Sequence, residues 1–137
     1  MKEVSITYLG VPPESLRKNK GRMSHWRYRQ RDTKTMRENA YMLILEAIGR
    51  ARPHYDQFVV DITQAWCGKP LDAEALASGT GAMLDAFQDA NIIDDDSPNG
   101  YLADYRLHWQ RVPKMTDRRV TMTVRGVSLL GASTRRE

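Results

Sequence analysis

The stretch YDQFVVDITQAW, residues 55–66, contains an apolar run that predicts a β-strand. Phe58, Val60 and Ile62 stand at every second position, which is the period of a half-buried strand. The residues on either side of this stretch follow a different, helical period. The chain is therefore expected to alternate between strands and helices, and the other elements can be placed outward from this strand.

Toward the N-terminus, apolar residues recur at spacings of three and four, which predicts a helix with one face toward a core. Asp32 or Thr33 can cap the start of this helix, and Gly49 and Pro53 bracket its end. Earlier still, the alternation of residues 4–8 predicts a first strand that stops before Gly10. The core-facing positions expected in this helix are Met36, Ala40, Leu43, Ile44, Ala47 and Ile48, and Met42 is also expected to fill the core.

Toward the C-terminus, Asp72 stands where the N-cap of a second helix is expected. That helix would run about 18 residues, although Gly79 and Gly81 would each cost roughly 1 kcal/mol relative to Ala in its early turns. Two strands follow, one over residues 103–109 with clean alternation and one through residues 120–124. The second helical stripe is expected to use Leu76, Met83, Leu84, Phe87 and Ala90.

The element order β-α-β-α-β-β predicts an α+β fold, in which two helices pack on one mixed sheet. A chain of 137 residues with 41% hydrophobic residues suits a single domain, here residues 1–128, followed by a flexible Arg-rich tail, 129–137. One cysteine excludes an internal disulfide, and no apolar run reaches the roughly 20 residues of a membrane span. We therefore expect a cytoplasmic protein.

Charge is distributed unevenly along the chain, whose formal net charge is +4. Residues 16–37, the basic segment, hold nine Lys and Arg and one acid, whereas residues 70–104, the acidic segment, hold eight acids and no Lys or Arg. Carboxylates gathered without cations repel one another unless something neutralises them, and Mg²⁺ or Mn²⁺ would do so. The plainer alternative is an N-cap at Asp72, a first-turn acid at Glu74 and a solvated turn over residues 94–100.

The order of several short motifs resembles the RusA-type Holliday junction resolvases of phages and prophages. The resemblance extends from about Ile6 to Trp109 and includes a Pro-Pro pair, a basic Gly-Arg segment, an acid-x-acid pair, Leu-Asp-Ala and Asp-Asp. In this chain those elements are Pro12-Pro13, Lys20-Gly21-Arg22, Asp72-Ala73-Glu74, Leu84-Asp85-Ala86 and Asp95-Asp96.

The resemblance implies a RusA-like fold, a homodimer and a Mg²⁺ site that cleaves phosphodiesters, with Mn²⁺ as a substitute and no organic cofactor. Asp72, Glu74 and Asp96 take the positions of the metal ligands, with Asp95 beside them. Two positions depart from the family pattern. Ala75 stands in place of an Asn, and Gly81 stands in place of the Lys that assists cleavage.

Lys69 lies three residues before Asp72, so we also consider it a catalytic candidate that replaces the missing cation. A solvated loop lysine is the commoner fate of such a residue. Losing a preorganised cation costs about 100 to 1,000-fold in rate, so its replacement matters.

The basic segment interleaves cations with aromatic rings, a pattern typical of contact with nucleic acid. The alternatives are a solvated loop, or a strap that folds over the acidic segment and neutralises it. The residues expected to hold phosphates of branched double-stranded DNA are Arg17, Lys18, Lys20, Arg22, Arg27 and Arg29.

Three functions follow as hypotheses. The first is a Mg²⁺-dependent endonuclease that resolves four-way DNA junctions in recombination and repair. The second is a catalytically weakened relative that acts as a DNA-binding or protein-binding module, favoured by Ala75 and Gly81. The third is an acidic DNA mimic that inhibits another protein. His54 and His108 have no partner at metal-ligand spacing in the sequence, so neither enters these hypotheses.

Overall fold

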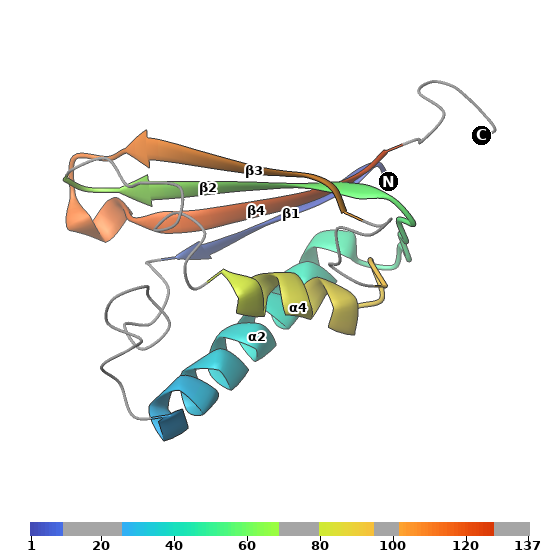
Figure 1. Ribbon diagram of the computed structural model, residues 1–137, viewed down its shortest axis with the longest axis horizontal. Coiled ribbons are helices and arrows are strands. Elements are labelled where there is room, and N and C mark those ends of the chain that lie inside the picture. The colour runs from blue at the N-terminus through green and yellow to red at the C-terminus, as the bar shows by residue number, and fades with distance from the viewer. Residues whose placement is uncertain (10–25, 69–79, 95–101, 128–137) are drawn as a thin grey trace.

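A mixed sheet of four strands carries two helices on one of its faces (Figure 1). The computed structural model describes residues 1–9, 26–68, 80–94 and 102–127. Its elements follow the predicted order and form one small α+β domain. They are β1 (Glu3–Leu9), α2 (Trp26–Ile48), β2 (Phe58–Trp66), α4 (Gly81–Asp89), β3 (Leu102–Arg111), the 3-10 turn η2 (Met115–Asp117) and β4 (Arg119–Gly126).

The strands lie in the order β1-β4-β2-β3. β4 pairs antiparallel with both β1 and β2, while β2 pairs parallel with β3. A parallel pair needs a crossover, which here includes α4. Because β2 and β3 run the same way, their carboxyl ends reach the same edge of the sheet.

Alternation along each strand separates a core face from an uncovered face. Val60 and Ile62 on β2 lie level with Val124 and Met122 on β4, and all four are fully buried beneath the helices. The residues between them, such as Asp61, point to the other face. The period of two in the sequence was therefore a reliable guide to strand orientation.

α2 extends further toward the N-terminus than the sequence predicted. It begins at Trp26, so Asp32 and Thr33 lie inside the helix rather than at its cap. The buried stripe consists of Met36, Ala40, Ile44 and Ile48, one residue every four. Met42, which is 63% exposed, and Ala47, which is also exposed, lie off this stripe, so their assignment to the core was wrong.

α4 is shorter than the predicted 18-residue helix. Thr80 precedes its first turn, and the backbone carbonyl of Thr80 accepts hydrogen bonds from the backbone N–H groups of Met83 and Leu84. Asp72 is therefore not the N-cap of this helix, and it lies outside the described residues together with Leu76. The predicted core positions Met83, Leu84 and Phe87 are buried, and Ala90 follows the last helical residue.

The two helices complete the core between them and the sheet. Phe58 from β2 and Phe87 from α4 are fully buried in the same cluster as Met36 and Met122. No helix in the described ranges is long and apolar enough to cross a membrane. The predicted tail, residues 129–137, lies outside the described part of the chain.

Candidate functional site

Most of the predicted site residues fall outside the described ranges. They are Lys69, Asp72, Glu74, Asp95 and Asp96 of the predicted catalytic and metal site, and Arg17, Lys18, Lys20 and Arg22 of the predicted DNA contact. Ala75 lies outside these ranges as well. Arg27 and Arg29 belong to the first turns of α2, and only their backbone is described.

The described residues that flank the acid pair of residues 72 and 74 are Gly68, after β2, and Thr80, just before α4. Gly81, where the resemblance places a Lys in the family, is the first residue of the helix. A Cβ added at Gly81 would meet no atom within 4 Å, and the backbone there does not have a positive φ. A Cβ at this position therefore causes no clash.

Polar side-chain groups are buried on β2, on β3 and just before α4. Gln64 on β2 is 2% exposed and Thr80 is fully buried, and each has an interaction partner. Trp109 lies level with Gln64 on the neighbouring strand β3. Its indole N–H is buried without a hydrogen-bond acceptor among the described residues. Buried polar groups are costly without partners, so this region differs chemically from the rest of the sheet–helix interface.

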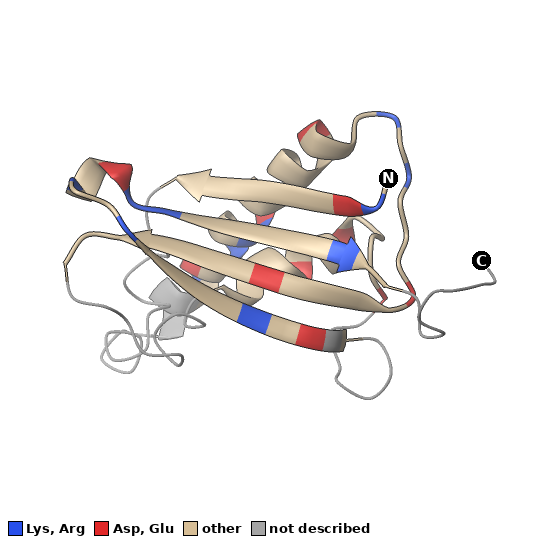
Figure 2. Cartoon of the chain, turned by 90° about the horizontal axis from the view of Figure 1, so that it is seen from above, with Lys and Arg blue, Asp and Glu red and all other residues tan. Residues whose placement is uncertain are grey.

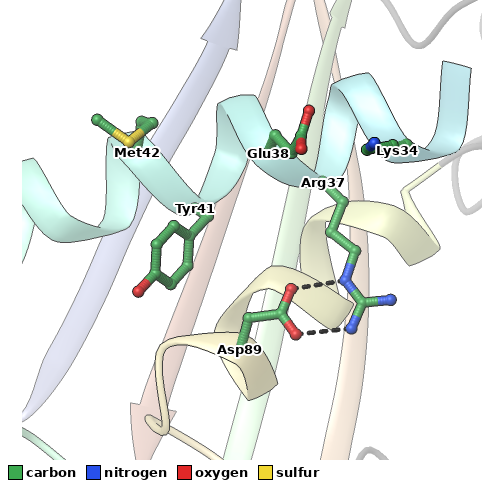
Figure 3. Close-up of a pocket in the computed structure, with 6 residues that line it drawn as sticks. All are labelled: Lys34, Arg37, Glu38, Tyr41, Met42 and Asp89. Atoms are coloured by element: carbon green, nitrogen blue, oxygen red, sulfur yellow. Dashed lines mark hydrogen bonds and ion pairs between the residues drawn. The ribbon is translucent and has the colours of Figure 1, made fainter. Parts of the chain in front are cut away.

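Arg37 of α2 holds two acids of α4. Its guanidinium donates two hydrogen bonds, both 2.6 Å long, to the carboxylate of Asp89, as drawn in Figure 3. The Asp85 carboxylate lies 3.8 Å from the same guanidinium. The hydrogen bonds from Arg37 lower the pKa of Asp89 below its ordinary value, while slight burial opposes that shift. The same hydrogen bonds and the two negative charges raise the pKa of Arg37.

A shallow cavity of about 690 Å³ opens beside this ion pair. It lies between the exposed sides of the two helices, and Figure 3 shows the side chains around it. The lining residues are Lys34, Arg37, Glu38, Tyr41, Met42 and Asp89.

His54, Asp56 and Asp94 come together beyond the other end of α4. One ligand atom from each side chain lies within 4.8 Å of the others. The Nδ1 atom of His54 is 2.8 Å from the backbone carbonyl oxygen of Asn91, and its Nε2 atom is 3.3 Å from the Asp94 carboxylate. The Asn91 carbonyl is the main cause of a raised pKa of His54; burial opposes it, and the charges of Asp94 and Asp56 add to it.

This cluster was missed by the sequence analysis, which found no metal-ligand partner for His54. Asp94 is 40 residues away along the chain, so no local pattern could reveal it. Two of the three residues could have been grouped from the sequence. His54 and Asp56 are two residues apart and would project to the same side of an extended segment.

The uncovered face of the sheet carries single charges along its strands rather than a continuous patch of one sign, as Figure 2 shows. Asp61 on β2 lies 3.2 Å from Nε2 of His108 and 3.8 Å from a guanidinium nitrogen of Arg125. On β3, Arg106 donates a hydrogen bond of 2.7 Å to Asp104, which lowers the pKa of that carboxyl. The expectation that Asp61 belongs to an exposed face is confirmed.

The acidic segment has no Lys or Arg of its own, and side chains from outside it lie beside its acids. Every acid of that segment within the described residues faces an arginine or a histidine, and one partner, Arg37, comes from the basic segment. Arg37 lies on α2, after residues 17–31, the stretch to which the alternative of a neutralising strap applies. The pairs are Asp85 and Asp89 with Arg37, Asp94 with His54, and Asp104 with Arg106.

Comparison of the chain with protein-family models and with curated proteins finds no match.

Proposed function

We propose that this protein is a Mg²⁺-dependent, structure-selective endodeoxyribonuclease that acts on four-way DNA junctions. The observation that carries the proposal is the ordered set of motifs in the sequence, which resembles the RusA-type resolvases. The fold supports it, because the elements have the order expected of a RusA-like chain on one mixed sheet.

The boundaries of α4 also support the proposal. If a single helix ran from Asp72 to Asp89, the two groups of acids would lie at opposite ends of a rod about 27 Å long. Because α4 begins at Gly81, residues 72 and 74 are not held in one straight helix with Asp89. The acids before and after α4 are therefore free of that obstacle to a common site.

The donor set of the proposed centre fits Mg²⁺. Asp72, Glu74, Asp95 and Asp96 offer only carboxylate oxygens, the ligands that this hard cation prefers. When bound, Mg²⁺ would polarise the scissile phosphate and lower the pKa of a water nucleophile. The acids of α4 are not part of this donor set, since they are already held by the guanidinium of α2.

The basic segment would deliver the DNA backbone to this centre. Arg17, Lys18, Lys20, Arg22, Arg27 and Arg29 neutralise phosphates in this proposal. A homodimer suits the substrate, because a four-way junction has two equivalent strands related by a two-fold axis and a C2 dimer offers one centre to each.

The direct test is cleavage of a synthetic four-way junction in the presence of Mg²⁺, compared with a linear duplex of the same sequence. We expect symmetric nicks in the junction, no cleavage of the duplex, and loss of cleavage in Asp72→Asn. Equal cleavage of both substrates, or full activity in Asp72→Asn, would contradict the proposal.

A second candidate function is a junction-binding module with weakened catalysis, and Gly81 is the observation that favours it. The open space at Gly81 makes this candidate testable, since Gly81→Lys restores a cation where the family carries one. The matched control Gly81→Gln adds a side chain without the charge. Cleavage raised about tenfold or more by Lys but not by Gln would indicate weakened catalysis in the parent chain. Binding without cleavage in the parent and in both variants would contradict the endonuclease and leave a binding module.

A further inference from the structure

We propose that His54, Asp56 and Asp94 form a binding site for a divalent transition-metal ion, with Zn²⁺ as the best match. This site shares no ligand with the Mg²⁺ centre proposed above, although Asp94 directly precedes Asp95 in the chain. It would link the residues that precede β2 to the turn that follows α4. It is the one group of three potential metal ligands within the part of the chain that the structure describes.

The orientation of the imidazole is the first argument. A carbonyl oxygen can only accept a hydrogen bond, so the contact of 2.8 Å to Asn91 requires the proton on Nδ1 of His54. Metal-binding histidines typically donate their second ring N–H to a carbonyl or carboxylate in this way, which fixes the tautomer. Nε2 faces the two carboxylates, and a metal ion bound there would replace the proton that Nε2 shares with Asp94.

The spacing of the ligand atoms is the second argument. Zn–N and Zn–O bonds of about 2.0–2.1 Å place two ligands of a tetrahedral ion about 3.3 Å apart. Nε2 of His54 lies 3.3 Å from Oδ2 of Asp94 and 3.7 Å from Oδ1 of Asp56. The Asp56 side chain is 91% exposed, so it can rotate to shorten the longer distance. A water molecule would complete the coordination.

The chain on both sides of the site is fixed before any ion binds. The backbone N–H of Tyr55 donates a hydrogen bond of 2.8 Å to the carbonyl oxygen of Ile92, which joins the two segments that supply the ligands. The Gln88 side chain donates a hydrogen bond of 3.0 Å to the carbonyl oxygen of Asp94. The ligands therefore approach one another without the ordering cost that a flexible loop would impose.

The chemistry of the ligands selects the class of ion. One imidazole and two carboxylates carry two negative charges, which a divalent cation neutralises. An imidazole nitrogen favours Zn²⁺ and its neighbours in the first transition row over Mg²⁺, which prefers an all-oxygen set.

The second histidine–aspartate pair of the described residues provides a matched control. Nε2 of His108 is 3.2 Å from Asp61, almost the same distance as in the proposed site. There, however, the third group is the guanidinium of Arg125, 3.8 Å from the same carboxylate, and it repels a cation. A histidine beside an aspartate is thus present in both places, and only one of them has the third ligand.

The experiment is calorimetric titration of Zn²⁺ into the untagged full chain, in buffer with millimolar Mg²⁺ to occupy all-oxygen sites. We expect one Zn²⁺ per chain, affinity reduced by about tenfold or more in His54→Gln and in Asp56→Asn, and no change in His108→Gln. Asp56→Asn is expected to fold like the parent, because that side chain is almost fully exposed. It therefore tests the site even if His54→Gln misfolds. Absence of binding in the parent chain, or equal binding in the parent, His54→Gln and Asp56→Asn, would overturn the site. Failure of this titration leaves the junction-cleavage result unaffected, so the two proposals are tested separately.

Discussion

The acids on α4 and the acid that follows α4 have different kinds of partner. On the helix, Asp85 and Asp89 face the guanidinium of Arg37, a cation that is permanently charged. Beyond the helix, Asp94 faces the imidazole of His54, which is neutral or charged according to its surroundings. A carboxylate held by an arginine is part of the helix packing, whereas one that faces an imidazole and a second acid is available to a metal ion.

The acids on and around α4 therefore fall into two groups, those that pair with Arg37 and those assigned to a metal ion. Asp85, although part of the Leu-Asp-Ala motif, lies beside Arg37, and Asp89 is held still more closely. The acids assigned to Mg²⁺ in the proposed function are others. The comparison therefore predicts that substitutions in the two groups have different consequences for cleavage and for stability.

The largest expected effect is on cleavage. We expect Asp96→Asn to reduce the rate of junction cleavage by about 100-fold or more, because a metal ligand is lost at the reacting phosphate. Asp89→Asn should leave the rate within about threefold, since it removes only a partner of Arg37. Single-turnover cleavage with Mg²⁺ measures both. Equal losses in the two variants would remove the distinction between the groups.

The next effect is on stability. Arg37→Met removes the cation from Asp89 and Asp85 and is expected to lower the free energy of unfolding by up to about 1 kcal/mol, the upper end for exposed pairs because the contact is bidentate. Urea unfolding at low and high salt measures it, and the loss should shrink as salt screens the charges. Arg106→Met, which removes a pair of half-exposed side chains within one strand, is the control and should show no measurable change. Losses of the same size in both variants would contradict the structural role of Arg37.

A smaller effect is expected when the charge is kept and the shape is changed. Arg37→Lys retains a cation but cannot donate two parallel hydrogen bonds to the Asp89 carboxylate. Its unfolding free energy should fall between those of the parent and Arg37→Met. A value equal to that of the parent would show that charge alone, and not the forked geometry, holds the helices together.

The smallest effect is the dependence of the pair on pH. The folded-state pKa of Asp89 is lowered by Arg37, so the folded chain binds fewer protons there than the unfolded chain. This contribution to stability is complete above the unfolded pKa, roughly 3.9, and is lost as pH falls through the lower folded value. The difference in unfolding free energy between the parent and Asp89→Asn should therefore shrink as the pH is lowered below about 4. A difference that grows on acidification would contradict the assignment.

The strands were predictable from sequence because period-two burial is a local property. Val60 and Ile62, for example, alternate with Asp61 in the sequence as they do in the sheet. The helix boundaries were less predictable from the sequence. The first turns of α2 contain no aliphatic residues at helical spacing, so no apolar stripe marks them in the sequence. Asp72 is a good N-cap type, but the described helix begins only after Thr80.

The candidate sites were predictable only in part. The motif order indicated a Mg²⁺ centre and its residues, all outside the described ranges. The pairing of Arg37 with Asp89 joins residues 52 apart, and that of His54 with Asp94 joins residues 40 apart. Both depend on how α4 packs, which is a tertiary property. A sequence pattern can therefore indicate which residues are suited to bind a metal ion, but it does not show which distant residues lie beside them.

The most direct test of the proposed Mg²⁺ centre is a crystal of the full chain soaked in Mn²⁺, with anomalous density as the readout. We predict a peak bounded by Asp72, Glu74 and Asp96, and none beside Asp85 and Asp89. Any density at Nε2 of His54 would concern the separate transition-metal site. Asp72 and Asp96 on distant parts of the molecule, with no ion shared between them, would contradict the central claim.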